Sequence, residues 1–371
     1  MKSLRFQIML AQPEDNKGIC GLIRIPFAGD ISLAMEREPD YFLGARIQYE
    51  QPETYVCRDR SNNRMAACFS VGKRNVFLNG RKTSLRYHSD LRIDPDYQKT
   101  FVLFDICSYF KEHIVLLEGF SQTIVFSDNH IMNALIHLKG RERLRSVVPF
   151  YIPHGRYITH TVSLRKRRNP KSSLYHIRQA RKEDVSMMQD FFDQEAGSKQ
   201  FYPCYDFSKV QSDYYHGLMV QDYFLAFEGE QLVGLTGIWD QQCFKQTRVA
   251  GYSNRLKILK PWINALGFLR SGFLLPDEGE KLNYVTLHTI VVKNNSSDIL
   301  AGLCESIYAR YREQNYQYML CGLDEQDPLN EVFRKGYEER KLVGTHYLVS
   351  YDEECLNKLN PALFYLEAAR I

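Results

Sequence analysis

Hydrophobic and polar positions alternate at the start of YHSDLRIDPDYQKTFVLFDI, residues 87–106. Leu91 and Ile93 fall on one face and the polar residues around them on the other, which predicts a strand that ends at Ile93. The segment 94–96, Asp-Pro-Asp, ends the strand, because proline donates no backbone hydrogen bond and restricts the residue before it. From about Gln98 onward the apolar residues recur at helical spacing, so a helix is predicted to follow the turn.

The same order of elements recurs later in the chain. FQIMLAQPED and YHIRQARKED share an aromatic residue, an isoleucine, an alanine and a Glu-Asp pair at identical offsets. Further pairs of similar segments follow in the same order; the four pairs are 6–15 with 175–184, 54–71 with 223–239, 87–98 with 286–297, and 122–140 with 318–336. The repetition predicts two copies of one unit, each built as strand, helical region, hairpin, strand, helix, strand, helix and strand.

A basic segment, LRKRRNPKSS at residues 164–173, lies between the two copies and is typical of a solvated linker. A chain of 371 residues is long enough for two domains that each bury a core. We therefore expect an N-terminal domain over residues 1–163 and a C-terminal domain over residues 174–371.

The two copies differ between their third and fourth strands. The first has a short connection around Asn79-Gly80, and Asn-Gly is a strong hairpin signal. The second has an insertion at about residues 243–283, which is basic, rich in aromatic residues and predicted to hold one or two short helices. Three interpretations of this insertion stay open: a helical cap, an element that binds substrate, or a helix on a membrane surface.

The element order and three segments resemble the GNAT superfamily of acyl-CoA-dependent N-acyltransferases. IRQARKEDV at 177–185 is similar to the family's first strand and turn, YHSDLRIDPDYQ at 87–98 to its central strand and acyl-CoA loop, and SDNHIMNALIHLKG at 127–140 to its last helix. The resemblance implies an α/β (α+β) fold of two tandem GNAT-like domains, each a mixed, mostly antiparallel central sheet flanked by helices. It also implies transfer of an acyl group, expected to be acetyl, from acyl-CoA to the amine of a small molecule or peptide.

The resemblance places the cofactor in the first copy. Family members bind the pyrophosphate with free backbone N–H groups at a helix N-terminus, in a loop of the form Gln/Arg-x-x-Gly-x-Gly/Ala. Gln98 stands at the first position of this loop, but Phe101 and Leu103 replace its small residues, and the second copy has no glycine there either. The residues expected to bind acetyl-CoA or another acyl-CoA are Leu91, Ile93, Gln98, Lys99, Thr100 and Asn129.

Many family members also use a base on the central strand to take a proton from the acceptor amine. The candidates at this position are Tyr87 and Asp90 in the first copy and His288 in the second. Structural roles are the alternative, with Asp90 paired to a neighbouring arginine and His288 a satisfied core histidine. The tyrosine that many members carry on the last helix is Ile136 in the first copy and an apolar residue in the second.

Two further functions stay open. The missing glycines and tyrosines are also what a non-catalytic binding or scaffold protein predicts, and a cleft filled by Phe101 and Leu103 would favour it. An acyltransferase that takes a long acyl chain from an acyl carrier protein is the other, and an apolar tunnel beneath residues 255–275 would favour that one.

Composition narrows the class of protein. A hydrophobic content of 44%, a charged content of 25% and a net charge of +4 describe an ordinary soluble protein and give no case for nucleic acid. The nine cysteines lie in apolar segments without metal-like spacing, which is typical of reduced thiols in a cytoplasmic protein without a metal site. The N-terminus turns polar too early for a signal peptide, and the longest apolar run, 261–276, is too short to be a transmembrane segment.

Overall fold

The structure is a computed structural model that describes residues 5–26, 29–127, 129, 132–133, 136, 147–166, 173–269 and 273–371. Most of the predicted linker and most of the helix predicted in segment 127–140 lie outside the described residues. The first half contains β1 (Phe6–Leu10), α1 (Asn16–Ile23), β2 (Ile31–Glu36), α2 (Tyr41–Gln48), β3 (Thr54–Asp59), β4 (Met65–Leu78), β5 (Arg81–Ile93), α3 (Val102–His113), β6 (Ser121–Phe126) and β7 (Phe150–Ser163). The second half contains β8 (His176–Gln179), α5 (Val185–Glu195), β9 (Tyr223–Glu228), β10 (Gln231–Trp239), β11 (Gln246–Tyr252), α6 (Asn254–Leu269), β12 (Tyr284–Val292), α7 (Ser297–Tyr311), β13 (Tyr318–Asp324), α8 (Asn330–Gly336) and β14 (Glu339–Ser350).

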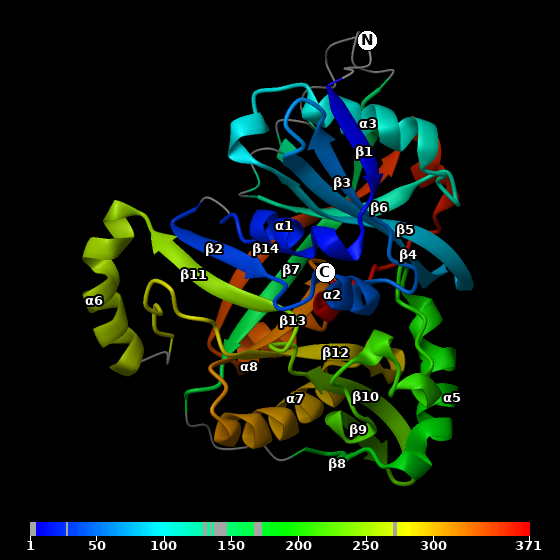
Figure 1. The fold of residues 1–371 in the computed structure, drawn as a ribbon. Coiled ribbons are helices and arrows are strands. Elements are labelled where there is room, and N and C mark those ends of the chain that lie inside the picture. Colours follow the sequence, from blue (N-terminus) through cyan, green and yellow to red (C-terminus); the bar gives the residue numbers. More distant parts are fainter. Residues whose placement is uncertain are drawn as a thin grey trace.

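One 12-stranded sheet runs through both halves, in the order β1-β3-β4-β5-β6-β14-β7-β13-β12-β10-β9-β8. The order is symmetric about its centre, because each strand of the first half has its counterpart at the mirrored position. The last strands are exchanged: β14 of the second half pairs with β6, and β7 of the first half pairs with β13. β7 and β14 also pair with each other along most of their length and lie at the middle of the sheet in Figure 1.

The two copies begin in the same way, as the repeat predicts. A short strand leads into a 3-10 turn at Pro13–Asp15 in the first half and at Lys182–Asp184 in the second. The last aspartate of each turn accepts a hydrogen bond from the backbone N–H three residues earlier, at 2.8 Å for Asp15 and 2.7 Å for Asp184. Each aspartate also pairs with an arginine, Arg58 in the first copy and Arg178 in the second.

The hairpin and the strand predicted around residues 79–93 are confirmed. Asn79 and Gly80 both have positive φ, 51° and 75°, as a tight two-residue hairpin turn requires, and they join β4 to β5. The helix that follows β5 begins at Val102 rather than at about Gln98. A 3-10 turn comes first, because the Asp94 side chain accepts the Asp96 N–H and holds the chain in a tighter turn.

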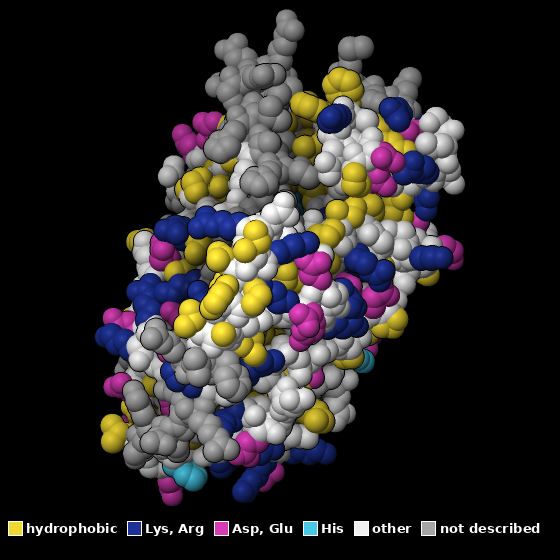
Figure 2. All heavy atoms as spheres, turned by 90° about the vertical axis from the view of Figure 1, so that its left-hand side faces the viewer, with side chains coloured by type: hydrophobic (Ala, Val, Ile, Leu, Met, Phe, Trp, Pro, Cys, Tyr) yellow, Lys and Arg dark blue, Asp and Glu magenta, His cyan; other side chains and the backbone are white. Residues whose placement is uncertain are grey.

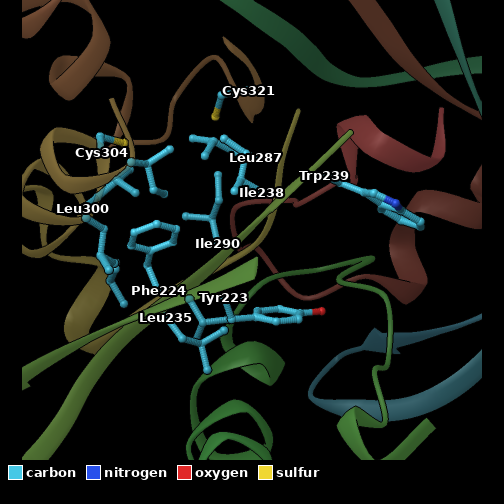
Figure 3. Packing of buried hydrophobic residues seen from close by; sticks show 14 of the residues in the cluster. Tyr223, Phe224, Leu235, Ile238, Trp239, Leu287, Ile290, Leu300, Cys304 and Cys321 are labelled. Carbon is cyan, nitrogen blue, oxygen red and sulfur yellow. The ribbon is translucent and has the colours of Figure 1, made fainter. Parts of the chain in front are cut away.

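Apolar side chains from both faces of the sheet form several buried clusters. The largest lies in the second half, where α5 and α7 cover strands β9, β10, β12 and β13. Figure 3 shows part of it, with the labelled residues Tyr223, Phe224, Leu235, Ile238, Trp239, Leu287, Ile290, Leu300, Cys304 and Cys321. A second cluster in the first half joins β3, β4 and β5 to α3.

The insertion of the second half reaches back to the first half. Its strand β11 pairs with β2 in a separate two-stranded sheet, and α6 follows it. On α6, Ile258, Trp262 and Leu266 are largely exposed and do not line a tunnel beneath the helix. Figure 2 looks onto this side and shows hydrophobic side chains gathered among Lys and Arg side chains. Among the described residues, no helix is long and apolar enough to cross a membrane.

Candidate active site

The central strand of each half separates from its parallel neighbour. β5 pairs with β6 only at Tyr87 and Gln122, although β5 continues to Ile93. In the second half β12 pairs with β13 over Tyr284–Thr286 and then continues to Val292 paired only with β10. Each half therefore has a wedge between two strands that opens toward their C-terminal ends.

A bulge marks the start of each wedge. Asp90 on β5 has a φ of 55° and Thr289 on β12 a φ of 56°, and these two residues align in the sequence repeat. The neighbour on the other edge of each central strand is β4 in the first half and β10 in the second. Its pairing with the central strand shifts register at the same level in both halves. A non-glycine residue in this left-handed region carries backbone strain, which proteins concentrate at functional sites.

The carboxylate of Asp90 lies in a polar cluster of the first half. The Tyr41 hydroxyl donates a hydrogen bond to Asp90 Oδ2 at 3.0 Å and lies 2.8 Å from Ser70 Oγ. Thr54 Oγ1 also lies 2.8 Å from Ser70 Oγ. Burial raises the pKa of Tyr41 well above its ordinary value, and the nearby Asp90 adds to this, so Tyr41 stays protonated and remains a donor. The cluster can hold the Asp90 carboxylate in one orientation.

Tyr87 has a different environment. Its ring is buried with the Arg74 guanidinium 3.8 Å from the ring centroid, and the centroid of the Tyr49 ring lies 6.4 Å away. Burial raises the pKa of Tyr87 to about 12. A phenol with this pKa is a poor general base at neutral pH, so the environment favours a packing role for Tyr87.

The predicted cofactor loop connects β5 to α3. Gln98 and Lys99 are exposed, and the Thr100 hydroxyl donates to the carbonyl oxygen of Tyr97 at 2.7 Å. The Phe101 side chain is 70% exposed and points away from the core, so it does not fill the wedge. This leaves an exposed lysine beside the N-terminus of a helix, where backbone N–H groups favour an anion.

The other predicted cofactor residues serve the fold through their side chains. Leu91 and Ile93 pack in the core cluster beneath α3. Their backbone lies on the part of β5 that has separated from β6. Asn129 Oδ1 accepts a hydrogen bond from the Met132 N–H at 3.1 Å, a contact typical of a helix-capping side chain.

In the second half a buried polar cluster fills the wedge. His288 is fully buried, and its Nδ1 lies 2.5 Å from the Thr289 hydroxyl. Its Nε2 lies 3.9 Å from Glu367, whose Oε2 accepts the Thr289 N–H at 2.8 Å. Burial lowers the pKa of His288 well below its ordinary value and raises that of Glu367. His288 is therefore neutral and enclosed by the C-terminal segment.

In the second half, a hydrogen bond joins the loop after β12 to the segment after β13. Asp327 follows β13 and is buried, and it accepts hydrogen bonds from Lys199 Nζ at 2.5 Å and from Asn295 Nδ2 at 2.9 Å. Asn295 belongs to the segment that aligns with the predicted cofactor loop of the first half. These contacts occupy polar groups that a phosphate would need, whereas Gln98 and Lys99 of the first half are exposed.

Sequence patterns did not indicate Tyr41, Lys199 or Glu367 as members of these clusters. Each comes from a segment far in sequence from the residues that it contacts, and none belongs to a recognisable motif. A cavity of about 320 Å³ near Asn283 and Gln317 lies at the other ends of β12 and β13, where these strands are still paired. Within the described part of the chain, no group of His, Cys, Asp and Glu side chains is arranged to hold a metal ion.

No protein-family model and no curated protein matches the chain in sequence. Solved structures do match it in shape. A GCN5-related glucosamine N-acetyltransferase region of a fungal multi-domain GH3 β-N-acetylglucosaminidase has a TM-score of 0.61 and 11% identity, over 94% of this chain and 38% of that one. This chain therefore spans less than half the length of that protein.

Two further structures are matched over most of their own length. A GCN5-related N-acetyltransferase from Sphaerobacter thermophilus has a TM-score of 0.59 and 12% identity, over 98% of this chain and 99% of that one. Saccharomyces cerevisiae N-myristoyltransferase with bound myristoyl-CoA has a TM-score of 0.57 and 9% identity, over 94% and 83%. At these identities the likeness concerns the fold alone.

Proposed function

We propose that this chain, which has the GNAT fold in two tandem copies, is an N-acyltransferase whose first half binds acyl-CoA and carries the general base, Asp90. The observation that supports this most is the left-handed Asp90 at the start of the first wedge, held by the Tyr41 hydroxyl. Structures of similar fold are named as N-acetyltransferases and as an N-myristoyltransferase with bound myristoyl-CoA. The acceptor is an amine of a small molecule or peptide.

The residues of the first half fit an acyl-CoA. Lys99 and Gln98 are exposed beside the N-terminus of α3, so they suit the pyrophosphate, and the separated part of β5 offers backbone groups to the pantetheine arm. In the second half, Asn295 of the equivalent loop donates a hydrogen bond to Asp327. We therefore assign the cofactor to the first half and a supporting role to the second.

The reaction needs one proton acceptor beside the amine. The acceptor nitrogen attacks the thioester carbonyl, the new C–N bond forms and the C–S bond breaks. Asp90 takes the proton that leaves the nitrogen, and Tyr41 keeps the carboxylate oriented. The departing thiolate has a pKa near that of cysteine, about 8.5, and so leaves without a dedicated acid. This fits the absence of a hydroxyl at Ile136.

Thermal unfolding with a panel of acyl-CoAs tests the binding half of the proposal. A ligand at about a hundred times its dissociation constant stabilises the native state by roughly 2.7 kcal/mol, which raises the melting temperature. We expect this rise to disappear in the double variant Gln98→Ala/Lys99→Ala and to persist in Lys17→Ala, which removes an exposed lysine of α1.

The same panel separates the alternatives. A rise with acetyl-CoA indicates a short acyl group, and a rise only with long-chain acyl-CoAs indicates a donor with a long chain. The absence of a rise with every member would contradict acyl-CoA binding and favour a non-catalytic binding protein or a carrier-protein donor.

A further inference from the structure

We propose that the cavity at the start of β12 and β13 is a binding site for a small phosphorylated molecule, whose phosphate group is held by Arg165 and Arg312. The cavity lies where the two halves meet, because Arg165 follows β7 of the first half and Arg312 follows α7 of the second. In the order of the sheet, β14 and β7 separate this place from the first wedge between β5 and β6. The site therefore does not depend on the function proposed above.

The cavity has the size of a small-molecule site. Its volume is about 320 Å³, and pockets that bind small molecules in proteins have volumes of about 300–1,000 Å³. Its lining includes two arginines, three side-chain amides, one tyrosine and one leucine. A volume at the lower end of the range admits a phosphate group together with a small organic part, such as glycerol or a sugar.

Hydrogen bonds within the protein fix the walls of the cavity. The Leu164 N–H donates to the Gln317 carbonyl oxygen at 2.9 Å, and the Gln317 N–H donates to the Asn283 carbonyl oxygen at 2.9 Å. The Asn283 side chain donates to the Asn315 carbonyl oxygen at 2.9 Å and accepts from Gln242 Nε2 at 2.7 Å. The shape of the cavity is therefore set before any ligand arrives.

The two arginines of the lining have guanidinium groups that can meet a ligand. Within the part of the chain that the structure describes, neither group donates a hydrogen bond or joins an ion pair. Arg165 is exposed and Arg312 is half-buried, so the cavity is open to solvent. A guanidinium presents a planar fork of N–H donors that matches the oxygens of a phosphate. Two such groups at one cavity can bind one phosphate together.

Acidic side chains do not neutralise these arginines. Among the described residues, no carboxylate lines the cavity. Two carboxylates contact other side chains of the lining: Asp240 accepts from the Tyr316 hydroxyl at 2.8 Å, and Glu280 accepts from Gln317 Nε2 at 3.2 Å. Neither of them pairs with Arg165 or with Arg312. The positive charge at the cavity is thus left for an anion.

The sequence that follows Arg165 adds to the positive charge. LRKRRNPKSS, residues 164–173, holds five Lys and Arg residues and no acidic residue. Residues 167–172 lie outside the described residues, and Lys166 pairs with Glu338 at 3.0 Å. An excess of positive charge in the chain beside a cavity raises the local concentration of anions. It therefore favours an anionic ligand over a neutral one.

A phosphate ester suits the site better than a carboxylate or a nucleic acid. It carries up to about two negative charges and three acceptor oxygens, whereas a carboxylate carries one charge and two oxygens. Nucleic acids are bound through many phosphates along an extended basic surface, whereas Arg165 and Arg312 lie at one cavity. The Tyr316 side chain lines the same cavity and offers contact to the organic part of the ligand.

Binding is measured on the full chain without acyl-CoA. The melting temperature is recorded during titration with inorganic phosphate, glycerol 3-phosphate and glucose 6-phosphate, with sulfate, glycerol and glucose in parallel and the ionic strength held constant with sodium chloride. We expect a saturable rise with a phosphate ester and none with glycerol or glucose. In Arg312→Gln and in Arg165→Gln the apparent dissociation constant should increase at least tenfold. Arg310→Gln, which removes an exposed arginine of α7 outside the lining, should keep the wild-type value.

A chemical probe then locates the bound ester. Phenylglyoxal modifies accessible guanidinium groups, and mass spectrometry of the digested protein measures the rate of modification at each arginine. We expect the ester with the highest affinity, at saturation, to slow the modification of Arg165 and Arg312 at least fivefold. The rate at Arg310 should stay the same.

Each outcome supports the site or overturns it. The absence of a saturable rise with every phosphorylated probe would overturn it, and so would a dissociation constant that Arg312→Gln and Arg165→Gln leave unchanged. An equal rise with sulfate would overturn the phosphate ester as the ligand. Protection of the same arginines by a single-stranded oligonucleotide, and by none of the small probes, would overturn the small-molecule ligand. The titration contains no acyl-CoA, so its result is separate from that of the acyl-CoA panel.

Discussion

Asp90 reaches its position through a backbone conformation that most side chains avoid. Its φ of 55° lies in the left-handed region, which aspartate and asparagine tolerate better than most other residues. The Tyr41 hydroxyl, which also contacts Ser70, then fixes the carboxylate at the edge of the wedge. The carboxylate of the proposed base is thus already held in one orientation.

Replacing Asp90 by asparagine tests its role. Asn also tolerates the left-handed region, so Asp90→Asn removes the proton acceptor and keeps the backbone. We expect kcat to fall at least about a hundredfold, the usual contribution of a general base, while the acyl-CoA-dependent rise in melting temperature stays. Asp193→Asn, on the surface of α5, is the control. A wild-type kcat in Asp90→Asn would exclude Asp90 as the base.

Buried histidines make the protein sensitive to acid. His346 is fully buried beside Phe364, and its Nδ1 has no hydrogen-bond partner. Burial lowers its pKa well below the ordinary value, and the neighbouring His154 contributes. The unfolded chain therefore binds a proton at His346 at a higher pH than the folded chain, and the free energy of unfolding falls as the pH drops below about 6.5.

The variant His346→Phe should lose less stability on acidification. Phenylalanine fits among the surrounding rings and cannot be protonated, so the decrease in the free energy of unfolding between about pH 7 and pH 5 should be smaller than in the wild type. Urea denaturation at the two pH values measures this. His113→Phe, at an exposed position of α3, should behave as the wild type. Equal decreases in His346→Phe and the wild type would contradict the assignment.

At the scale of elements, the ribbon of β2 and β11 joins the insertion of the second half to the first half. Glu36 of β2 is 3% exposed and accepts hydrogen bonds from Arg248 Nε at 2.8 Å and Nη2 at 3.2 Å. These hydrogen bonds lower the pKa of Glu36. The stabilisation is therefore complete at neutral pH and is lost as the pH falls below the ordinary glutamate value of about 4.3.

Removal of Arg248 should weaken this ribbon. Arg248→Ala leaves a buried carboxylate with the more distant Arg24 and Lys281, and we expect the free energy of unfolding to fall by about 2 kcal/mol at pH 7. The loss should shrink at acidic pH below the lowered pKa of Glu36, where Glu36 is protonated in both states. The double variant Glu36→Gln/Arg248→Ala should be more stable than Arg248→Ala alone. A loss that is the same at both pH values would contradict the ion pair.

At the scale of the whole molecule, the exchange of β7 and β14 makes the two halves depend on each other. β7 lies between β13 and β14, so its backbone partners are both in the second half. β6 in turn receives β14 as its neighbour. The predicted domain boundary at 164–173 thus follows a strand that has already crossed to the other half.

Dividing the chain should therefore prevent folding. Residues 1–163 alone would leave β6 with an open edge and β7 without partners, and residues 174–371 alone would leave β13 and β14 incomplete. We expect neither fragment to show a cooperative thermal transition by circular dichroism, and co-production of both to restore it. A cooperative transition in either fragment alone would show that the half folds independently.

The local features of the fold followed from the sequence. The Asn79-Gly80 turn, the hairpins and the two aligned starts at Asp15 and Asp184 are set by alternation, turn chemistry and capping within a few residues. The alignment of Asp90 with Thr289 was likewise visible before any coordinates, and both residues lie at bulges. The predicted GNAT fold is confirmed by the likeness to the solved structures.

The sequence by itself determined two copies of one α/β unit and the order of elements in each, because periodicity and turn residues act over short distances. Only the tertiary structure decided that the last strands β7 and β14 are exchanged between the halves, which hydroxyl holds Asp90, and which arginines line the cavity at the start of β12 and β13. The hydrogen bond from Tyr41 to Asp90 joins residues on different elements, and Arg165 and Arg312 lie far apart in the chain. Contacts of this kind depend on packing across the whole sheet, and no local pattern specifies them.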